Sequence, residues 1–166
     1  MQESLIKCEL FEGLAPELQT PLIAIARRQT LPKGEYVFML GDHADRLFVL
    51  LQGKVEVCFP MAVGNTVKDV AVETMEAGRA FGVSAVIKPY RFTLSARAAE
   101  KSELATFSRA DLFQILDADP VLGRAFMGQL VDVLGRRFLT MRALWGRELQ
   151  RSINEARSTP GAKRTG

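Results

Sequence analysis

A glycine-containing turn near the middle of the chain has the residues best suited to ligand chemistry. The run from Phe81 to Ala85 predicts a turn that opens a short helix, and an arginine follows at Arg91. The first turn of a helix leaves backbone N–H groups without intrahelical partners and carries the positive end of the helix dipole, so it suits an anion. The candidate ligand-binding residues are Phe81, Gly82, Val83, Ser84, Ala85, Arg91, Phe92 and Thr93.

The composition predicts a globular binding protein and argues against catalysis. The chain has 166 residues, of which 48% are hydrophobic and 25% charged, enough for one domain and a helical extension. Cys8, Cys58 and a single histidine are too few for a disulfide framework or a metal site, and no catalytic set can be assembled. We expect no enzyme. The apolar runs are too short for a membrane span and no signal peptide is evident, which predicts a cytoplasmic protein.

Short segments rich in Val, Phe, Leu and Thr, separated by Gly or Asp turns, follow two or more expected short helices over residues 4–28. Strands at this spacing indicate an antiparallel sandwich or roll. The fold class expected is therefore α+β, a jelly-roll-like β-roll with N-terminal helices and a long C-terminal helix. The strands are expected at residues 36–40, 47–51, 55–59, 70–75, 93–98 and 104–107.

Two helices are expected after the strands. Ser108 is a candidate N-cap for a short helix that ends before Asp119-Pro120, and a longer helix is expected from about residue 121 to about residue 156. This division predicts a β-roll domain over 1–120, a long helix over 121–157 and a disordered tail over 158–166. One face of the long helix is apolar, and we expect it to form a homodimer interface. Its members are Met127, Leu130, Leu134, Phe138, Met141, Trp145 and Leu149.

Helices, a roll of short strands, a short helix and a long helix, in this order, resemble the cyclic-nucleotide-binding domain family. The first signature of that family is matched by Gly41-Asp42-x-Ala44, the apolar run 47–50 and Gly53. Gly34, Gly41 and Gly53 would supply turns with positive φ, which need no ligand. The resemblance implies a β-roll that binds a cyclic nucleotide, cyclic AMP or cyclic GMP, and acts in transcriptional or second-messenger regulation in a bacterium.

The second signature of the family is altered here. The resemblance implies a Glu that accepts a hydrogen bond from the ribose 2′-hydroxyl and an Arg that pairs with the cyclic phosphate, but Val83 and Phe92 occupy those two positions. Arg91 is one residue away, and in a strand that shift points a side chain to the opposite face unless a bulge re-aims it. The pocket would then favour a more apolar ligand, another small anion held by backbone amides, or no ligand.

Two functions remain open from the sequence. The first is a small-ligand sensor with weakened or altered cyclic nucleotide recognition, which signals through its C-terminal helices. The second is a ligand-free dimeric scaffold whose basic helix recruits an acidic protein partner, since residues 136–166 carry a net charge of +6 and residues 1–135 a net charge of −3. Relatives that regulate transcription continue into a helix-turn-helix domain, which this sequence does not contain, so nucleic-acid binding is not expected.

Overall fold

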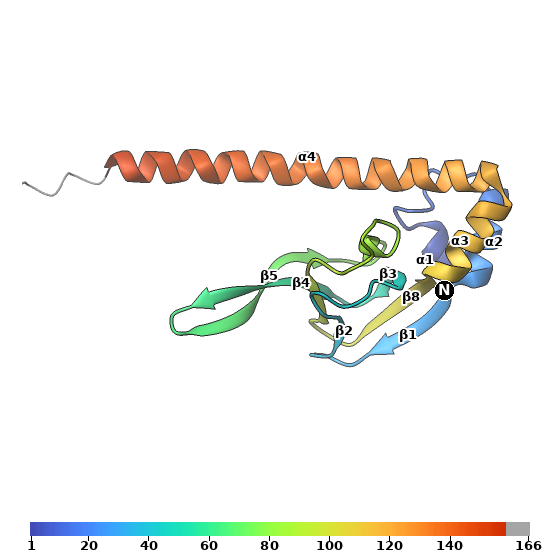
Figure 1. Cartoon of the computed structure of the whole chain (residues 1–166), viewed down its shortest axis with the longest axis horizontal. Helices are drawn as coiled ribbons and strands as arrows, with labels where there is room; N and C mark the ends of the chain where they lie inside the picture. The colour runs from blue at the N-terminus through green and yellow to red at the C-terminus, as the bar shows by residue number, and fades with distance from the viewer. Residues whose placement is uncertain (159–166) are drawn as a thin grey trace, which may run out of the picture. The chain divides into compact units, whose positions relative to one another are not determined.

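The β-roll is built from two four-stranded antiparallel sheets in a computed structural model that describes residues 1–158 (Figure 1). The strand order is β1-β8-β3-β6 in one sheet and β2-β7-β4-β5 in the other. The strands are β1 Arg27–Leu31, β2 Tyr36–Phe38, β3 Arg46–Gln52, β4 Val55–Val63, β5 Thr66–Met75, β6 Ala80–Phe81, β7 Ser95–Ala98 and β8 Ser102–Ser108.

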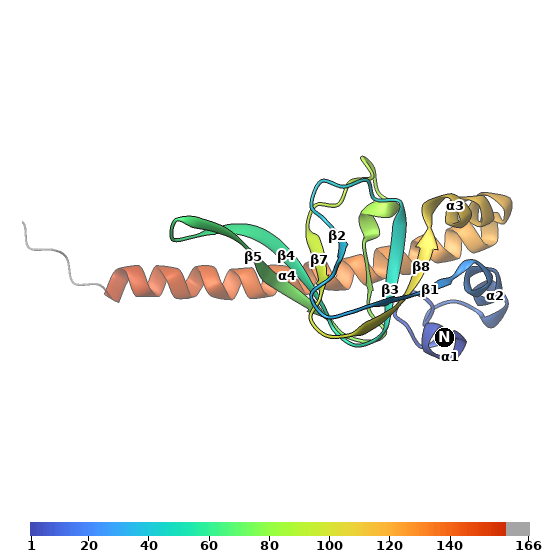
Figure 2. The ribbon, with the colours of Figure 1, turned by 90° about the horizontal axis from the view of Figure 1, so that it is seen from below.

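The short helices gather at one end of the roll, and the β4–β5 hairpin extends at another (Figures 1 and 2). Phe11, which follows α1, packs its ring 6.1 Å from that of Phe107 on β8, and both side chains are buried. This contact places the N-terminal segment over the hydrophobic core. The helices are α1 Gln2–Ile6, α2 Pro16–Ile25, the 3₁₀ helix η1 Val83–Ala85, α3 Arg109–Ala118 and α4 Pro120–Ser158.

The fold expected from the sequence is confirmed, and the six expected strands are present with shifted ends. Two strands were missed. Arg27–Leu31 is mostly polar and exposed, as an edge strand can be, while Ala80–Phe81 has only two residues. Strand β4 also runs past Phe59 to Val63, because it continues to pair with β5 beyond the body of the roll.

The two C-terminal helices begin and end close to their predicted limits. Ser108 is the N-cap residue of α3, and Asp119 separates α3 from α4. Asp119 Oδ1 accepts hydrogen bonds from the N–H groups of Val121 and Leu122, at 2.9 and 3.1 Å, and therefore caps α4. This capping role was not predicted from the sequence. Among residues 1–158, no helix combines the length and the apolar character needed to cross a membrane.

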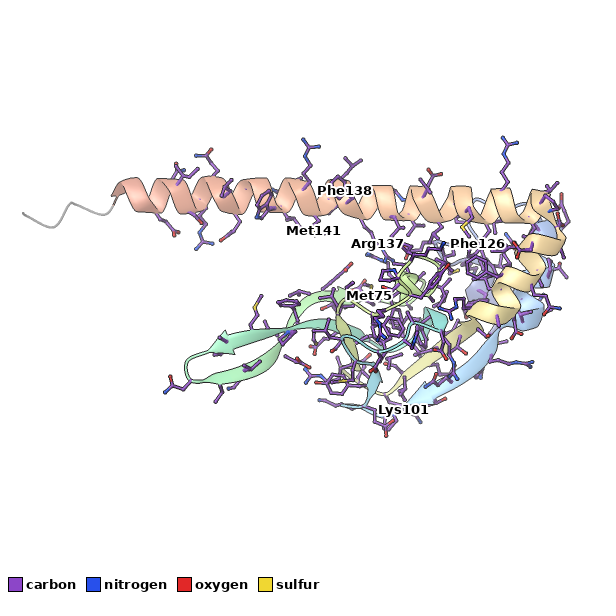
Figure 3. The ribbon with its side chains drawn as sticks, viewed as in Figure 1. Met75, Lys101, Phe126, Arg137, Phe138 and Met141 are labelled. Atoms are coloured by element: carbon purple, nitrogen blue, oxygen red, sulfur yellow. The ribbon has the colours of Figure 1, made fainter. Side chains whose placement is uncertain are left out.

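The chain divides into two compact units, Met1–Gln129 and the residues from Leu130 onward. The first contains the β-roll, the short helices and the first turns of α4, including the buried Phe126 (Figure 3). The second is the remainder of α4. Of the tail expected over 158–166, only Ser158 lies within the described residues, as the last residue of α4.

Gly53 is required by the turn between β3 and β4. The sequence predicted positive φ at Gly34, Gly41 and Gly53, and their φ values are 90°, 90° and 94°. A Cβ at Gly53 would lie 2.6 Å from the carbonyl oxygen of Lys101 and 2.7 Å from Ser102 Cα, which are backbone atoms that cannot rotate away. We therefore expect Gly53→Ala to lower the free energy of unfolding by about 2 kcal/mol or more, measured by urea denaturation.

Gly64 is the matched control for this substitution. It has a φ of 60° in the β4–β5 turn, and an added Cβ would meet no atom within 4 Å. Gly64→Ala should therefore lower the free energy of unfolding only by the cost of a positive φ for a residue with a Cβ, about 1 kcal/mol. Equal losses in the two variants would contradict the steric role assigned to the residues around Gly53.

Candidate ligand-binding site

Gly82 lets the chain turn sharply between β6 and η1. Its φ is 73°, and an added Cβ would lie 2.8 Å from Cδ2 of Phe48 and 3.3 Å from the carbonyl oxygen of Arg46. A side chain at this position would both strain the backbone and displace the neighbouring strand β3. Gly82 is thus explained by packing within the roll, with no contribution from a ligand.

The helix that follows Gly82 is a single 3₁₀ turn, Val83–Ala85. Its hydrogen bonds run from the Ala85 N–H to the Gly82 carbonyl and from the Val86 N–H to the Val83 carbonyl, both at 3.0 Å. Because a helix dipole is the sum of aligned peptide units, so short a turn provides little positive potential for an anion. If an anion binds at this turn, as the sequence suggests, side chains contribute more to its binding than the dipole of this helix does.

Phe92 lies inside the roll, at the position where the family resemblance implies an arginine. Its side chain is 4% exposed and stacks on Phe38 of β2, with ring centroids 3.7 Å apart and ring planes 9° from parallel. Hydrogen bonds of the Phe92 backbone N–H to Asp42 O, at 3.0 Å, and of the Gly41 N–H to Phe92 O, at 2.8 Å, hold the residue in this place. An aromatic ring thus occupies the position for which the family resemblance implies a guanidinium.

Two further rings extend this stack into a cluster of four, which we call the phenylalanine cluster: Phe38, Phe48, Phe81 and Phe92. The Phe38 centroid lies 5.6 Å from that of Phe48 and 6.1 Å from that of Phe81, and Phe48 and Phe81 are 5.3 Å apart. Aromatic pairs at such separations are worth about 0.5–1.5 kcal/mol each beyond their buried area. The cluster stabilises a filled interior.

Phe38 and Phe48 were not among the residues predicted for the site. Their positions in the expected strands 36–40 and 47–51 carried a signal, because side chains on a strand alternate between its two faces. This alternation predicts which face of the sheet Phe38 and Phe48 occupy, but it does not predict that Phe38 contacts the ring of Phe92.

Arg91 points away from the phenylalanine cluster. Its backbone forms an isolated bridge with His43, its Nη1 donates a hydrogen bond to the Gly41 carbonyl at 2.8 Å, and the residue is exposed. Thr93 is also exposed, Val83 and Ser84 are half-buried, and Phe81 and Ala85 are buried. The eight predicted residues therefore share one segment, but in this structure Phe92 faces the interior and Arg91 does not.

A small hollow of about 190 Å³ lies against one side of the cluster. Pockets that enclose drug-sized ligands commonly measure about 300–1,000 Å³, so this hollow is small for a nucleotide. Its polar lining comes mainly from the Gly41–Arg46 turn and not from the Gly82–Ala85 turn. The lining residues are Gln29, Val37, Phe38, Asp42, His43, Asp45, Arg46, Phe48 and Phe92.

The two thiols do not offer a reactive site. Cys8 and Cys58 are both buried, and burial raises the pKa of the Cys8 thiol to about 11. The thiol of Cys8 therefore stays protonated at neutral pH, and it is the thiolate that reacts with electrophiles and binds metals. Within the part of the chain that the structure describes, no group of three or more His, Cys, Asp and Glu residues could hold a metal ion.

The distal part of α4 exposes an apolar stripe, which we define as Phe138, Met141, Trp145 and Leu149. These four side chains are 60%, 63%, 69% and 51% exposed, and Phe138 and Met141 project from the helix in Figure 3. The other predicted interface residues differ from them. Leu130 is buried in the single chain, and Met127 and Leu134 are half-buried, so only the distal four present an open face.

This fold defines a class of protein, a β-roll of two antiparallel sheets, in which the predicted ligand-binding segment begins at β6 and ends before β7. The sequence profile described as Cyclic nucleotide-binding domain matches residues 28–119, which is more than half of the 166-residue chain. The chain belongs to the cyclic nucleotide-binding domain family.

Two curated relatives are similar to most of this chain. The Cyclic AMP receptor protein of Thermus thermophilus is 28% identical over 128 residues, which cover 77% of this chain and 56% of that protein. Glutaminase 1 of Bradyrhizobium diazoefficiens is 30% identical over 81% of this chain and 21% of the relative. The chain thus spans from about a fifth to just over half of the length of these curated relatives.

The fold also matches solved structures. A protein of Geobacter metallireducens, described in its structure as a cyclic nucleotide-binding protein, superposes with a TM-score of 0.69 at 28% identity. The match covers 82% of this chain and 97% of that one. The sensor domain of the transcriptional regulator DNR of Pseudomonas aeruginosa superposes with a TM-score of 0.63 at 25% identity, over 82% and 90% of the two chains.

Proposed function

We propose that this protein is a non-catalytic regulatory module whose cassette, residues 81–93, has weakened or altered recognition of cyclic nucleotides. The stack of Phe92 on Phe38 carries this proposal. In the proposed function, a change at the cassette is signalled through α3 and α4 to a protein partner in the bacterial cytoplasm. Its support is the family membership, together with a buried ring at the position where a phosphate-binding arginine is implied.

The expected loss of affinity follows from the two altered contacts. A hydrogen bond to a charged group is worth about 1.5–3 kcal/mol, so the absence of a carboxylate at Val83 and of a guanidinium at Phe92 removes about 3–6 kcal/mol. That difference weakens binding by more than about a hundredfold. The ring of Phe92 adds a steric term, because a cyclic phosphate cannot occupy its volume.

Isothermal titration calorimetry of nucleotide-stripped protein with cyclic AMP and cyclic GMP tests this directly. We expect no saturable heat at ligand concentrations below about 0.1 mM, since the losses above move a dissociation constant of about 1 μM to between about 0.2 mM and about 25 mM. Micromolar binding of either nucleotide would show that Arg91 or the backbone replaces the missing pair, and would overturn the altered recognition proposed here.

Dimerisation through the apolar stripe is part of the same proposal. Four large apolar side chains that are each at least half exposed on one helical face are unusual for a surface that stays in water. Phe138, Met141 and Trp145 recur at spacings of three and four, which suits helix-to-helix packing with a second copy. Sedimentation velocity of the full chain measures this association.

The phenylalanine cluster also favours a second function, that of a ligand-free dimeric scaffold. In that function the filled interior only stabilises the roll, and the basic side of α4 recruits an acidic partner. At 100° per residue, Arg136 and Arg147 lie opposite the apolar stripe, and Arg151 lies between that side and the flank of Met141. Arg151 already pairs with Glu155 at 2.9 Å, which leaves less of that positive charge for a partner. We rank the scaffold second, because the family match supports a ligand-sensing module.

A further inference from the structure

Two segments far apart in the sequence are joined along the edge of the cassette. The Ala44 N–H donates to the Tyr90 carbonyl at 2.8 Å, and the Phe92 N–H donates to the Asp42 carbonyl at 3.0 Å. The Gly41 N–H donates to the Phe92 carbonyl at 2.8 Å, and Arg91 Nη1 donates to the Gly41 carbonyl. We call the turn 41–45 and the segment 90–92 together the clasp. Movement at Phe92 is therefore transmitted to the turn through hydrogen bonds.

Arg109, the first residue of α3, is attached to both halves of the clasp. Its N–H donates to the Asp45 carbonyl at 2.7 Å, and its Nη1 donates to the Ala44 carbonyl at 3.1 Å. Its guanidinium carbon lies 4.5 Å from the ring centroid of Tyr90, within the range of a cation–π interaction. A single side chain thus joins the start of α3 to the last residues of the cassette.

The backbone of Tyr90 supplies independent support. Its φ is 60°, and it has positive φ without being a glycine. An L-residue avoids this conformation because its Cβ approaches the following carbonyl, and it persists only where the surroundings hold it. The Ala44 hydrogen bond and the Arg109 guanidinium are contacts that hold Tyr90 in place. A change in the cassette that releases Tyr90 would therefore remove a contact of α3.

We propose that Arg109 is the positioning residue that couples the cassette to α3. This inference rests on the proposed function, in which the cassette signals through the helices, and it names the route that the signal takes. The guanidinium makes two contacts at once: its Nη1 donates to the Ala44 carbonyl, and its central carbon lies over the Tyr90 ring. A lysine keeps the charge but cannot make both contacts in this geometry.

Hydrogen exchange of the α3 amides, followed by mass spectrometry, can measure this coupling without a known ligand. Phe92→Leu disturbs the cassette by removing the ring stack while keeping a large apolar side chain. Exchange in β8 serves as the internal reference, so that a global loss of stability is divided out. In the otherwise native chain we expect Phe92→Leu to raise α3 exchange relative to β8 by about fivefold or more, the lower end of typical coupling factors.

The same substitution is then made in an Arg109→Lys background. In that background we expect Phe92→Leu to change the exchange rate of the α3 amides relative to β8 by less than about twofold, since the Arg109 side chain that couples the two parts is absent. Tyr90→Phe is the matched control: it keeps the aromatic face, so the fivefold effect of Phe92→Leu should remain. Tyr90→Leu removes that face and should reduce the effect as Arg109→Lys does.

The outcomes separate this inference from the proposed function. An effect of Phe92→Leu on α3 that persists in full in the Arg109→Lys background would overturn the role of Arg109 and leave signalling through the helices intact. Absence of any effect in the native background would overturn signalling from the cassette to α3 itself. Cyclic nucleotide binding in calorimetry contradicts altered recognition and does not affect the Arg109 comparison.

Discussion

The double substitution Val83→Glu, Phe92→Arg is expected to bind cyclic AMP or cyclic GMP at least about a hundredfold more tightly than the native chain, because it restores two charge-assisted contacts. Removing the ring of Phe92 also opens the volume beside Phe38, where it stacks at 3.7 Å in the native chain. Calorimetry under the conditions used for the native protein measures the change.

Unliganded, the double variant should be less stable than the native chain. It removes the Phe92 stack and places an arginine in a buried position, which is expected to lower the free energy of unfolding by about 3 kcal/mol or more. Circular dichroism verifies that the variant is folded before titration, and a rise in melting temperature with added nucleotide gives a second reading of binding.

Val83→Gln, Phe92→Met is the matched control for this experiment. Its side chains have similar lengths but carry no charge, so it should open the interior without gaining affinity. If the charged variant folds and still binds no nucleotide, the cavity has collapsed around the remaining rings, and the ligand-free scaffold becomes the better account.

Trp145→Ala is expected to dissociate the proposed dimer. Truncation of a central aromatic residue at an interface commonly costs about 2 kcal/mol or more, and a symmetric dimer contains two copies. The combined loss of about 4 kcal/mol corresponds to a rise of roughly a thousandfold in the dissociation constant. Sedimentation velocity over a range of concentrations should detect that shift.

Leu139 provides a matched control on the same helix. It is 63% exposed, close to the 69% of Trp145, but at 100° per residue it lies outside the apolar stripe. Leu139→Ala should therefore leave the dissociation constant within about threefold of the native value. A native chain that remains monomeric at high concentration, or a dimer that survives Trp145→Ala, would contradict the interface.

The fold could be predicted from sequence where local patterns and turn chemistry agree. The apolar run 47–50 followed by Gly53 predicted β3 and its turn, and Asp119-Pro120 predicted the break between α3 and α4. Strand β1 could not be recognised, because its pairing with β8 arises from residues that are distant in the sequence and its own composition is polar.

The sequence predicts which segment would hold the candidate site, but it does not predict the geometry of that segment. Counting along the family signature placed Phe92 where an arginine is implied, and the structure buries that residue. The partners of Phe92 and Arg91 were not predictable, because Phe38 and Gly41 come from another part of the chain and meet them only in the folded roll. The contact between Tyr90 and Arg109 was not predictable either, because the two residues are distant in the sequence and Tyr90 adopts a positive φ.

The stack of Phe38 and Phe92 bears on how fast any ligand could bind in the cassette. A molecule that occupies this interior has to wait until the two rings separate, so association follows a conformational change of the protein. Its apparent affinity is reduced in proportion to the small fraction of molecules in which the rings are apart. Association rates that level off at high ligand concentration would be the kinetic sign of such a closed interior, whatever the chemistry of the ligand.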